Sequence, residues 1–314
     1  MCCLFGLFDY AHVFNGRQKS RLLSILAQAC EVRGTDATGI AYNVGGALHI
    51  FKRPVPAHRL RLHIPSSAAV VMGHTRLTTQ GSEKKNYNNH PFYGKAGNME
   101  FAFAHNGVIY NDIDLRRKQK LPRTKIQTDS YIAVQLIEQQ KALDLDTLRT
   151  MAEQIEGSFS FTVLDRENKL YFIKGDNPLY ILHYSKAGFL IYASTREILA
   201  HALSRMHLPE ERPEQISLEC GEIARIDLRG QVVRTRFCTD RLRSNLFAPG
   251  GISCSWRGWK GHFSPARMTW KERYLEDLKS VAGSFGYSSD DIDHLLEMGL
   301  TAEEIESYLY DGEL

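Results

Sequence analysis

The sequence is poor in the features that mark several classes of protein. Its 314 residues include six cysteines, scattered with no C-x-x-C pair, so we expect neither a disulfide framework nor a standard zinc site. No apolar run approaches the roughly 20 residues that span a bilayer. A formal net charge of +3 is too small to indicate nucleic-acid binding. We therefore expect a cytoplasmic protein with reduced thiols and with no metal, membrane partner or nucleic-acid partner.

Other signals are missing as well. Polar residues, Asp9 and His12 among them, interrupt any apolar stretch near the N-terminus, so we expect no export signal. No segment repeats with a fixed period. The residues after Thr239 contain no phosphate-binding loop and no nucleotide-binding pattern, so the sequence gives no reason to expect a cofactor.

What is present is an irregular mixture of strand and helix patterns. Short apolar runs predict strands, the first over Leu4–Tyr10, and the glycine pair Gly45-Gly46 predicts a hairpin. The apolar run "FAFAHNGVIY" predicts a strand that ends in an Asn-Gly turn. Helices are predicted over Gln18–Arg33 and after a cap at Thr128 or Asp129. Because strands and helices do not alternate regularly, the order favours an α+β fold.

The composition changes near residue 239. We expect a main domain over residues 1–238, a Gly-, Ser- and Trp-containing linker over 239–272 and a small acidic helical hairpin over 273–314. Thr301 and Glu304 have capping-box spacing for the second helix of the hairpin. One apolar face is predicted for the hairpin, from Leu295, Leu296, Met298, Leu300, Ile305 and Leu309. Since so small a hairpin buries little surface by itself, we expect it to dock on the main domain or on a partner.

Cys2 is the first candidate for chemistry. Removal of Met1 would leave a thiol and a free α-amino group on the same residue. An α-amino group has an ordinary pKa of about 7.7–8.0, so it can accept a proton at neutral pH. A thiol activated in this way attacks a carbonyl carbon. Cys2 is therefore a candidate nucleophile.

Several motifs follow Cys2 in a fixed order. They are "CCLFGLF", "RGTDATGIAY", "GHTRLTTQG", "NNHPF", "FAHNGVIYN" and "TDS". Together they resemble the class II glutamine amidotransferase domain, a member of the N-terminal nucleophile hydrolases, over roughly residues 2–237. The resemblance implies a four-layer αββα sandwich of two antiparallel sheets between helices. One departure is Cys3, which stands where the family usually has glycine.

The resemblance also implies roles for individual residues. Cys2 would be the nucleophile, and the Asn106 side chain and the Gly107 N–H would stabilise the oxyanion. Arg76 would bind the α-carboxylate of glutamine in a bidentate fork. Asp129 would bind its α-ammonium group, a role that is compatible with capping a helix.

Further residues have supporting roles in the same comparison. Thr79 and Gln80 would help to hold the carboxylate. Arg33 and Asp36 would pack near the nucleophile, and His90 would shape the edge of the site. The histidines of these motifs, His74, His90 and His105, are expected to be structural, since the α-amino group serves as the base.

The implied reaction is hydrolysis of the glutamine side-chain amide through a Cys2 thioester, which releases ammonia and glutamate. No acceptor domain is recognisable after residue 239, so we expect a separate ammonia acceptor that docks at the hairpin. One alternative is a stand-alone amidohydrolase of a γ-glutamyl compound. Another is a recruitment module, because "MGL" in the hairpin faintly resembles ubiquitin-associated helical modules.

Overall fold

The computed structural model describes residues 2–242 and, farther along, 275, 278–279, 282, 287–302 and 304–305. The chain divides into two compact units, Met1–Ile252 and Ser253–Leu314, and each is described by itself. Residues 243–272 of the predicted linker lie outside the described residues, so the domain boundaries at 238/239 and 272/273 stay predictions.

The first unit contains a seven-stranded sheet with the order β11-β9-β10-β1-β4-β2-β3, in which every pair is antiparallel. Its strands are β1 (Cys3–Asp9), β2 (Ala37–Val44), β3 (Ala47–Arg53), β4 (Val70–Arg76), β9 (Tyr180–Tyr184), β10 (Phe189–Ala193) and β11 (Glu214–Gln215). β1 lies in the middle, between β10 and β4. The predicted hairpin is confirmed, since β2 and β3 join at Gly45 and Gly46, which both have positive φ angles.

A second, six-stranded antiparallel sheet has the order β13-β12-β8-β7-β6-β5. Its strands are β5 (Phe92–Ala96), β6 (Met99–Ile109), β7 (Gly157–Asp165), β8 (Leu170–Lys174), β12 (Glu222–Ile226) and β13 (Val232–Arg236). The helices of the unit are α1 (Gly16–Ala29), α2 (Asp112–Lys118), α3 (Tyr131–Gln140), α4 (Leu145–Ala152) and α5 (Arg196–Leu203). Short 3-10 turns are η1 (Cys30–Arg33), η2 (Ala57–Arg59) and η3 (Asn86–Asn88).

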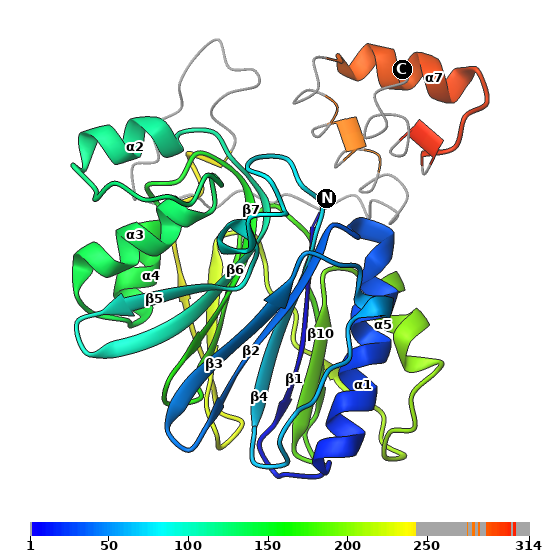
Figure 1. Ribbon diagram of the computed structural model, residues 1–314. Coiled ribbons are helices and arrows are strands. Elements are labelled where there is room, and N and C mark those ends of the chain that lie inside the picture. The colour runs from blue at the N-terminus through cyan, green and yellow to red at the C-terminus, as the bar shows by residue number, and fades with distance from the viewer. Residues whose placement is uncertain are drawn as a thin grey trace, which may run out of the picture. The chain divides into compact units, whose positions relative to one another are not determined.

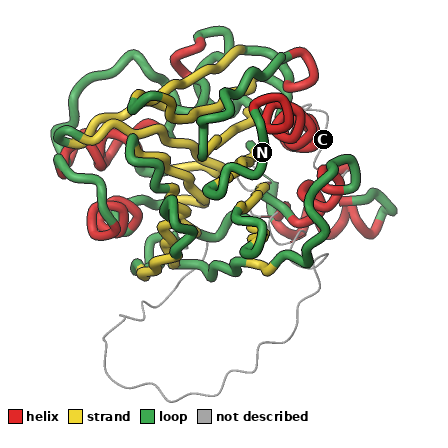
Figure 2. The backbone as a smooth tube through the Cα atoms, turned by 90° about the horizontal axis from the view of Figure 1, so that it is seen from below, coloured by secondary structure: helices red, strands yellow, loops and turns green. Residues whose placement is uncertain are grey.

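Three apolar cores define the layers of this unit. One packs α1 and α5 against the first sheet, and a second packs α3 and α4 against the second sheet. The third core, which includes Leu4, Met72 and Ala104, fills the space between the two sheets. Helices therefore cover the outer faces of both sheets (Figure 1), and the strands gather between them when the unit is seen from below (Figure 2). The predicted αββα sandwich is confirmed.

Two local predictions are wrong. The Asn106-Gly107 pair is not a turn, because β6 continues through it to Ile109 and pairs with β7. The N-cap of α3 is Ser130 and not Thr128 or Asp129, and no side chain caps that helix. In both cases a tertiary contact replaces the local one that the sequence pattern favours.

The Ser253–Leu314 unit contains α7 (Ser289–Glu297) and a small core around Ile292 and Ile305. The predicted capping box is confirmed, because Glu304 N donates to Thr301 Oγ1 and Thr301 N donates to Glu304 Oε2. Met298 was predicted to join the apolar face, but it is 66% exposed. Leu309, predicted on the same face, lies outside the described residues.

A buried ion pair joins α1 to the end of β1. Lys19 Nζ lies 3.1 Å from Asp9 Oδ2, and both side chains have no exposed surface. Lys19 also donates to the carbonyls of Ser66 and Ala68, while Asp9 accepts from two backbone N–H groups. The pair is thus fully hydrogen-bonded, which is the condition under which a buried charge is tolerated.

Lys19→Met should destabilise the protein by about 3–5 kcal/mol, because it leaves the Asp9 carboxylate buried without its cation. Denaturant unfolding measures the change. The matched control is Arg21→Met on the exposed side of the same helix, which should stay within roughly 0.5 kcal/mol of the parent. Equal losses in the two variants would contradict this account of the pair.

Candidate active site

Strand alternation brings the key side chains to one end of the space between the sheets. Successive side chains of a strand point to opposite faces. Leu4, Met72, Ala104 and Tyr192 all belong to the core between the sheets. Continuing the alternation by one step from Leu4, Ala104 and Tyr192, and by two steps from Met72, places four polar side chains on that same inner side. They are Cys2, Asn106, Ser194 and Arg76, at neighbouring ends of β1, β6, β10 and β4.

Cys2 lies directly before β1 and is partly exposed. Its Sγ is 3.5 Å from the Leu77 carbonyl oxygen, and Arg33 Nε donates to the Cys2 carbonyl at 3.2 Å. Burial raises the pKa of the Cys2 thiol, whereas the Leu77 contact and the Arg76 charge act to lower it. The thiol is therefore held in a protonated form that requires a base before it can attack.

Arg76 is only 3% exposed, and burial lowers the pKa of its guanidinium while the nearby Asp36, Glu83 and Asp129 carboxylates oppose that change. It donates to Asn89 Oδ1 and to the carbonyls of Gln80 and Gly81, which belong to the loop that follows β4. Asp36 Oδ2 accepts from Thr78 N at 2.7 Å and so holds the start of this loop. Thr79 and Gln80 are exposed. The structure thus brings Arg33, Asp36 and Gln80 to this end of the sheets, while Thr79 faces solvent.

Asn106 and Gly107 lie inside β6. The Asn106 side chain is fully buried, its Nδ2 is 3.5 Å from Ser194 Oγ, and its Oδ1 has no hydrogen-bond partner within the described part of the chain. Buried polar atoms without partners are rare in native proteins and point to a ligand or a strained site. Gly107 has φ +140°, and a Cβ there would lie 1.9 Å from the Ser158 carbonyl oxygen, so only glycine fits.

Asp129 is buried before α3. Its Oδ2 accepts from Ile109 N at 2.6 Å and its Oδ1 accepts from Ser130 Oγ at 3.2 Å. This tertiary bond to the end of β6 explains why the carboxylate does not cap the helix. Burial raises the pKa of Asp129, and the donors Ile109 and Ser130 and the charge of Arg76 oppose that rise. A carboxylate is thus fixed near the strand that carries Asn106 and Gly107.

Three buried histidines surround this end of the sheets. His74 and His90 have ring centroids 4.2 Å apart, and His74 Nε2 contacts the His105 carbonyl oxygen at 2.8 Å. His105 Nδ1 contacts Ser130 Oγ at 2.8 Å. Burial lowers the pKa of His74 and of His105 to about 3 and that of His90 well below its ordinary value. Neutral, packed rings of this kind agree with the structural role expected for them.

Ser194 was missed by sequence reasoning. Its Oγ accepts from Leu4 N at 2.8 Å and lies beside Asn106, so it connects the start of β1 to β6. Asn177 was also missed, although its Nδ2 donates to the Asn106 carbonyl at 2.9 Å. A serine or asparagine that follows an apolar strand carries no distinctive signal, and only the pairing of the strands reveals these contacts.

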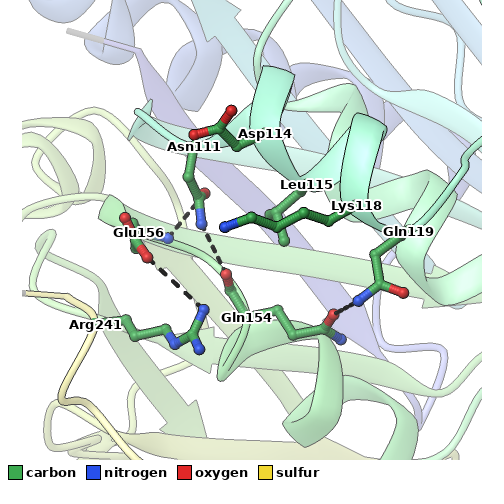
Figure 3. Close-up of a pocket in the computed structure, with 8 residues that line it drawn as sticks. All are labelled: Asn111, Asp114, Leu115, Lys118, Gln119, Gln154, Glu156 and Arg241. Carbon is green, nitrogen blue, oxygen red and sulfur yellow. Dashed lines mark hydrogen bonds and ion pairs between the residues drawn. The ribbon is translucent and has the colours of Figure 1, made fainter.

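A polar pocket of about 240 Å³ lies beside α2 (Figure 3). Lys118, Gln154 and Arg241 are among its lining, and Arg241 forms an ion pair with Glu156 at 3.7 Å. None of the predicted site residues lines it, so we do not assign it to the site.

Among the described residues, no group of three or more His, Cys, Asp or Glu side chains is placed to hold a metal ion. No described helix has the length and apolarity needed to cross a membrane.

The buried histidines predict a pH-dependent stability. Their folded-state pKa values lie below the unfolded value near 6.5, so the unfolded chain binds more protons and stability falls as the pH drops below about 6.5. His90→Phe, which keeps a ring against Phe92, should reduce the loss between pH 7 and pH 5 by roughly 1–2 kcal/mol. Denaturant midpoints at the two pH values measure it. The exposed His49→Phe should leave the pH dependence unchanged, and an unchanged dependence in His90→Phe would contradict the assignment.

Comparison with known proteins shows which families and proteins this chain is similar to. A family model described as a glutamine amidotransferase domain matches residues 74–201. A glutamine–fructose-6-phosphate aminotransferase (isomerizing) of Bacillus licheniformis is 35% identical over 159 residues, which are 48% of this chain and 26% of that protein. Its counterpart in Lactococcus lactis is 30% identical over 191 residues, 58% of this chain and 30% of that protein. The chain thus spans less than a third of the length of these relatives.

A solved structure has a similar fold. The structure of glutamine phosphoribosylpyrophosphate amidotransferase from B. subtilis superposes with a TM-score of 0.60 at 17% identity, covering 76% of this chain and 50% of that one. At this identity the likeness concerns the fold, an antiparallel two-sheet sandwich with outer helices. The family match over residues 74–201 and these relatives make the chain similar to class II glutamine amidotransferase domains, and the fold agrees with that similarity.

Proposed function

We propose that this protein hydrolyses the side-chain amide of glutamine through a thioester on Cys2, and that it releases ammonia and glutamate. The observation that carries the proposal is the convergence of Cys2, Arg76 and Asn106 on the inner side of the sandwich, with Asp129 near the same strand ends. Thiol, cation, amide and carboxylate are the four kinds of group that the reaction of glutamine requires.

In the proposed reaction Met1 is removed first, so that the α-amino group of Cys2 becomes free. This amine takes the thiol proton, and Sγ attacks the glutamine carboxamide carbon. The need for a base agrees with the raised pKa of the buried thiol. The C–N bond then breaks, the proton passes to the leaving nitrogen as ammonia forms, and water hydrolyses the γ-glutamyl thioester to glutamate.

The tetrahedral intermediate carries a negative oxygen, for which Asn106 Nδ2 and the Gly107 N–H are the proposed donors. Two features support this. The Asn106 Nδ2 group has only one contact, a long one of 3.5 Å to Ser194 Oγ, and the close approach of the Ser158 carbonyl at Gly107 leaves that position without a side chain. Each oxyanion donor of this kind contributes roughly 100- to 1,000-fold to the rate in other hydrolases.

The ends of glutamine are matched by opposite charges. Arg76 is the proposed partner of the α-carboxylate, with Thr79 and Gln80 of the adjoining loop helping to hold it. Asp129 is the proposed partner of the α-ammonium group. Arg33, Asp36 and His90 are proposed as supports, the first through its bond to the Cys2 carbonyl and the second through its bond to Thr78 N.

We propose that the ammonia passes to a separate acceptor protein, which docks at the acidic hairpin of residues 273–314. The apolar Met298, exposed at the end of α7, supports a docking role. We place the reaction in the cytoplasm, where thiols stay reduced, since the cysteines of the described residues are all free.

Cys2→Ala should lower glutamine hydrolysis by at least about 1,000-fold, because it removes the only group that forms the thioester. Ammonia release measures the loss, and intact mass of the parent protein should show that Met1 is absent. Cys3→Ala is the matched control. It should keep most of the activity, since Cys3 points into the core against α1 and not toward the site.

Two outcomes would overturn the proposal: active protein that retains Met1, or a Cys2→Ala variant as active as Cys3→Ala. An electrophilic glutamine analogue should add once, at Cys2. Faster turnover of another γ-glutamyl amide than of glutamine would instead favour the stand-alone amidohydrolase.

A further inference from the structure

Arg76 is a buried cation without a paired anion. None of the ion pairs among the described residues includes it, and its three hydrogen-bond acceptors are the neutral oxygens of Asn89, Gln80 and Gly81. These bonds use both Nη2 hydrogens and one Nη1 hydrogen, and of the five N–H donors of a guanidinium they leave Nε–H and the second Nη1–H. The carboxylates of Asp36, Glu83 and Asp129 act on Arg76 only from beyond ion-pair distance. Because a buried charge without a direct counter-ion is costly, an anion that arrives with the substrate would complete the arrangement.

Asn89 fixes the orientation of this guanidinium. Its Oδ1 accepts from Arg76 Nη1 at 2.7 Å, while its Nδ2 donates to the Glu83 carbonyl at 2.8 Å and to Asn86 Oδ1 at 3.2 Å. The side chain has no exposed surface. Since both ends of the amide are used, turning it over would place an N–H₂ group against the cation. Asn89 therefore has one favourable orientation, and Arg76 is oriented with it.

Lys52, near the end of β3, holds the backbone of Asn89 in turn. Its Nζ donates to the Asn89 carbonyl and, at 2.9 Å, to the Pro91 carbonyl, and it lies 5.1 Å from the centre of the Phe92 ring. Asn86 Nδ2 donates back to the Lys52 carbonyl at 2.9 Å. Burial and the neighbouring Arg76 charge lower the pKa of Lys52 to about 8. The outer strand of the first sheet is thus linked to Arg76 through one asparagine.

We propose that Asn89 is a positioning residue that holds the Arg76 guanidinium in place for the α-carboxylate of glutamine, with Lys52 as its anchor. The inference rests on the proposed function and adds to it a residue that touches neither the substrate nor the reacting atoms. Asn89 governs capture of the carboxylate and leaves the reactivity of Cys2 unchanged.

Asn89→Asp tests this directly. The carboxylate keeps the shape of asparagine and its contact with Arg76, but it neutralises the cation and loses the Nδ2 donor. The neutralised and less firmly held Arg76 should lose a hydrogen bond to the α-carboxylate of glutamine. The KM for glutamine should therefore rise roughly 10- to 100-fold, while kcat changes less than about threefold. Lys52→Gln should also raise the KM for glutamine, by a smaller factor. Asn98→Asp, at an exposed site, controls for the change in net charge.

Two alkylating reagents separate positioning from a general structural defect. A diazoketone analogue of glutamine keeps the α-carboxylate, whereas iodoacetamide has none. In Asn89→Asp the rate of Cys2 labelling by the analogue should fall at least about tenfold, and the rate with iodoacetamide should stay within about twofold. Mass spectrometry follows both rates, and the unfolding midpoint verifies the fold.

The outcomes are distinguishable. If the parent protein is not labelled at Cys2 by the analogue, the proposed function fails. If the parent is labelled and Asn89→Asp is labelled equally fast, the positioning role of Asn89 is wrong while the function stands. If both reagents slow by the same factor, the substitution acts on the structure of the site and the inference is again overturned.

Discussion

The antiparallel pairing of β1 with β4 is the constraint on which the rest of the site depends. Cys3 lies opposite Thr75, and this register brings Cys2 to the end of β4 that carries Arg76. β10 fixes the other side of β1, with Phe5 opposite Ala193. A slip of one residue would turn every side chain of β1 to the opposite face. Cys2 would then face α1, and the buried Leu4 and Phe8 would leave the core between the sheets.

The same alternation accounts for the unusual Cys3. Its side chain belongs to the core beneath α1, together with Cys30, and has no exposed surface. It thus points away from Cys2, so the two adjacent thiols of the sequence do not act as a pair. A buried cysteine behaves as a small apolar residue. The departure from the family's glycine is therefore a packing difference on the side of the strand that faces the helices.

Apolar runs and glycine turns predicted strands, helices and an α+β fold, because such patterns determine strands locally, whereas the αββα sandwich was predicted only through the family resemblance. The site residues were predictable only through the ordered motifs. Two predictions about the backbone around them, a turn at Asn106-Gly107 and a helix cap at Asp129, were wrong. Asn106-Gly107 has the composition of a turn, yet pairing with β7 keeps it in a strand. Asp129 has the position of a helix cap, yet the N–H of Ile109 binds its carboxylate. Ser194 and Asn89 act through contacts between distant segments, which no local pattern specifies.

The two ends of β1 differ in how completely their buried polar groups are paired. At one end the charges of Asp9 and Lys19 satisfy each other, and every neighbouring donor or acceptor adds to that pair. At the other end, within the described part of the chain, Arg76 has no ion-pair partner and the Asn106 amide oxygen has no donor. Leaving polar groups partly unsatisfied reduces stability. The loss is tolerated in a three-core sandwich, and a zwitterionic amide such as glutamine would supply the missing anion and hydrogen-bonding partners when it binds. The end of β1 that contributes least to folding is thus the end best prepared for a ligand.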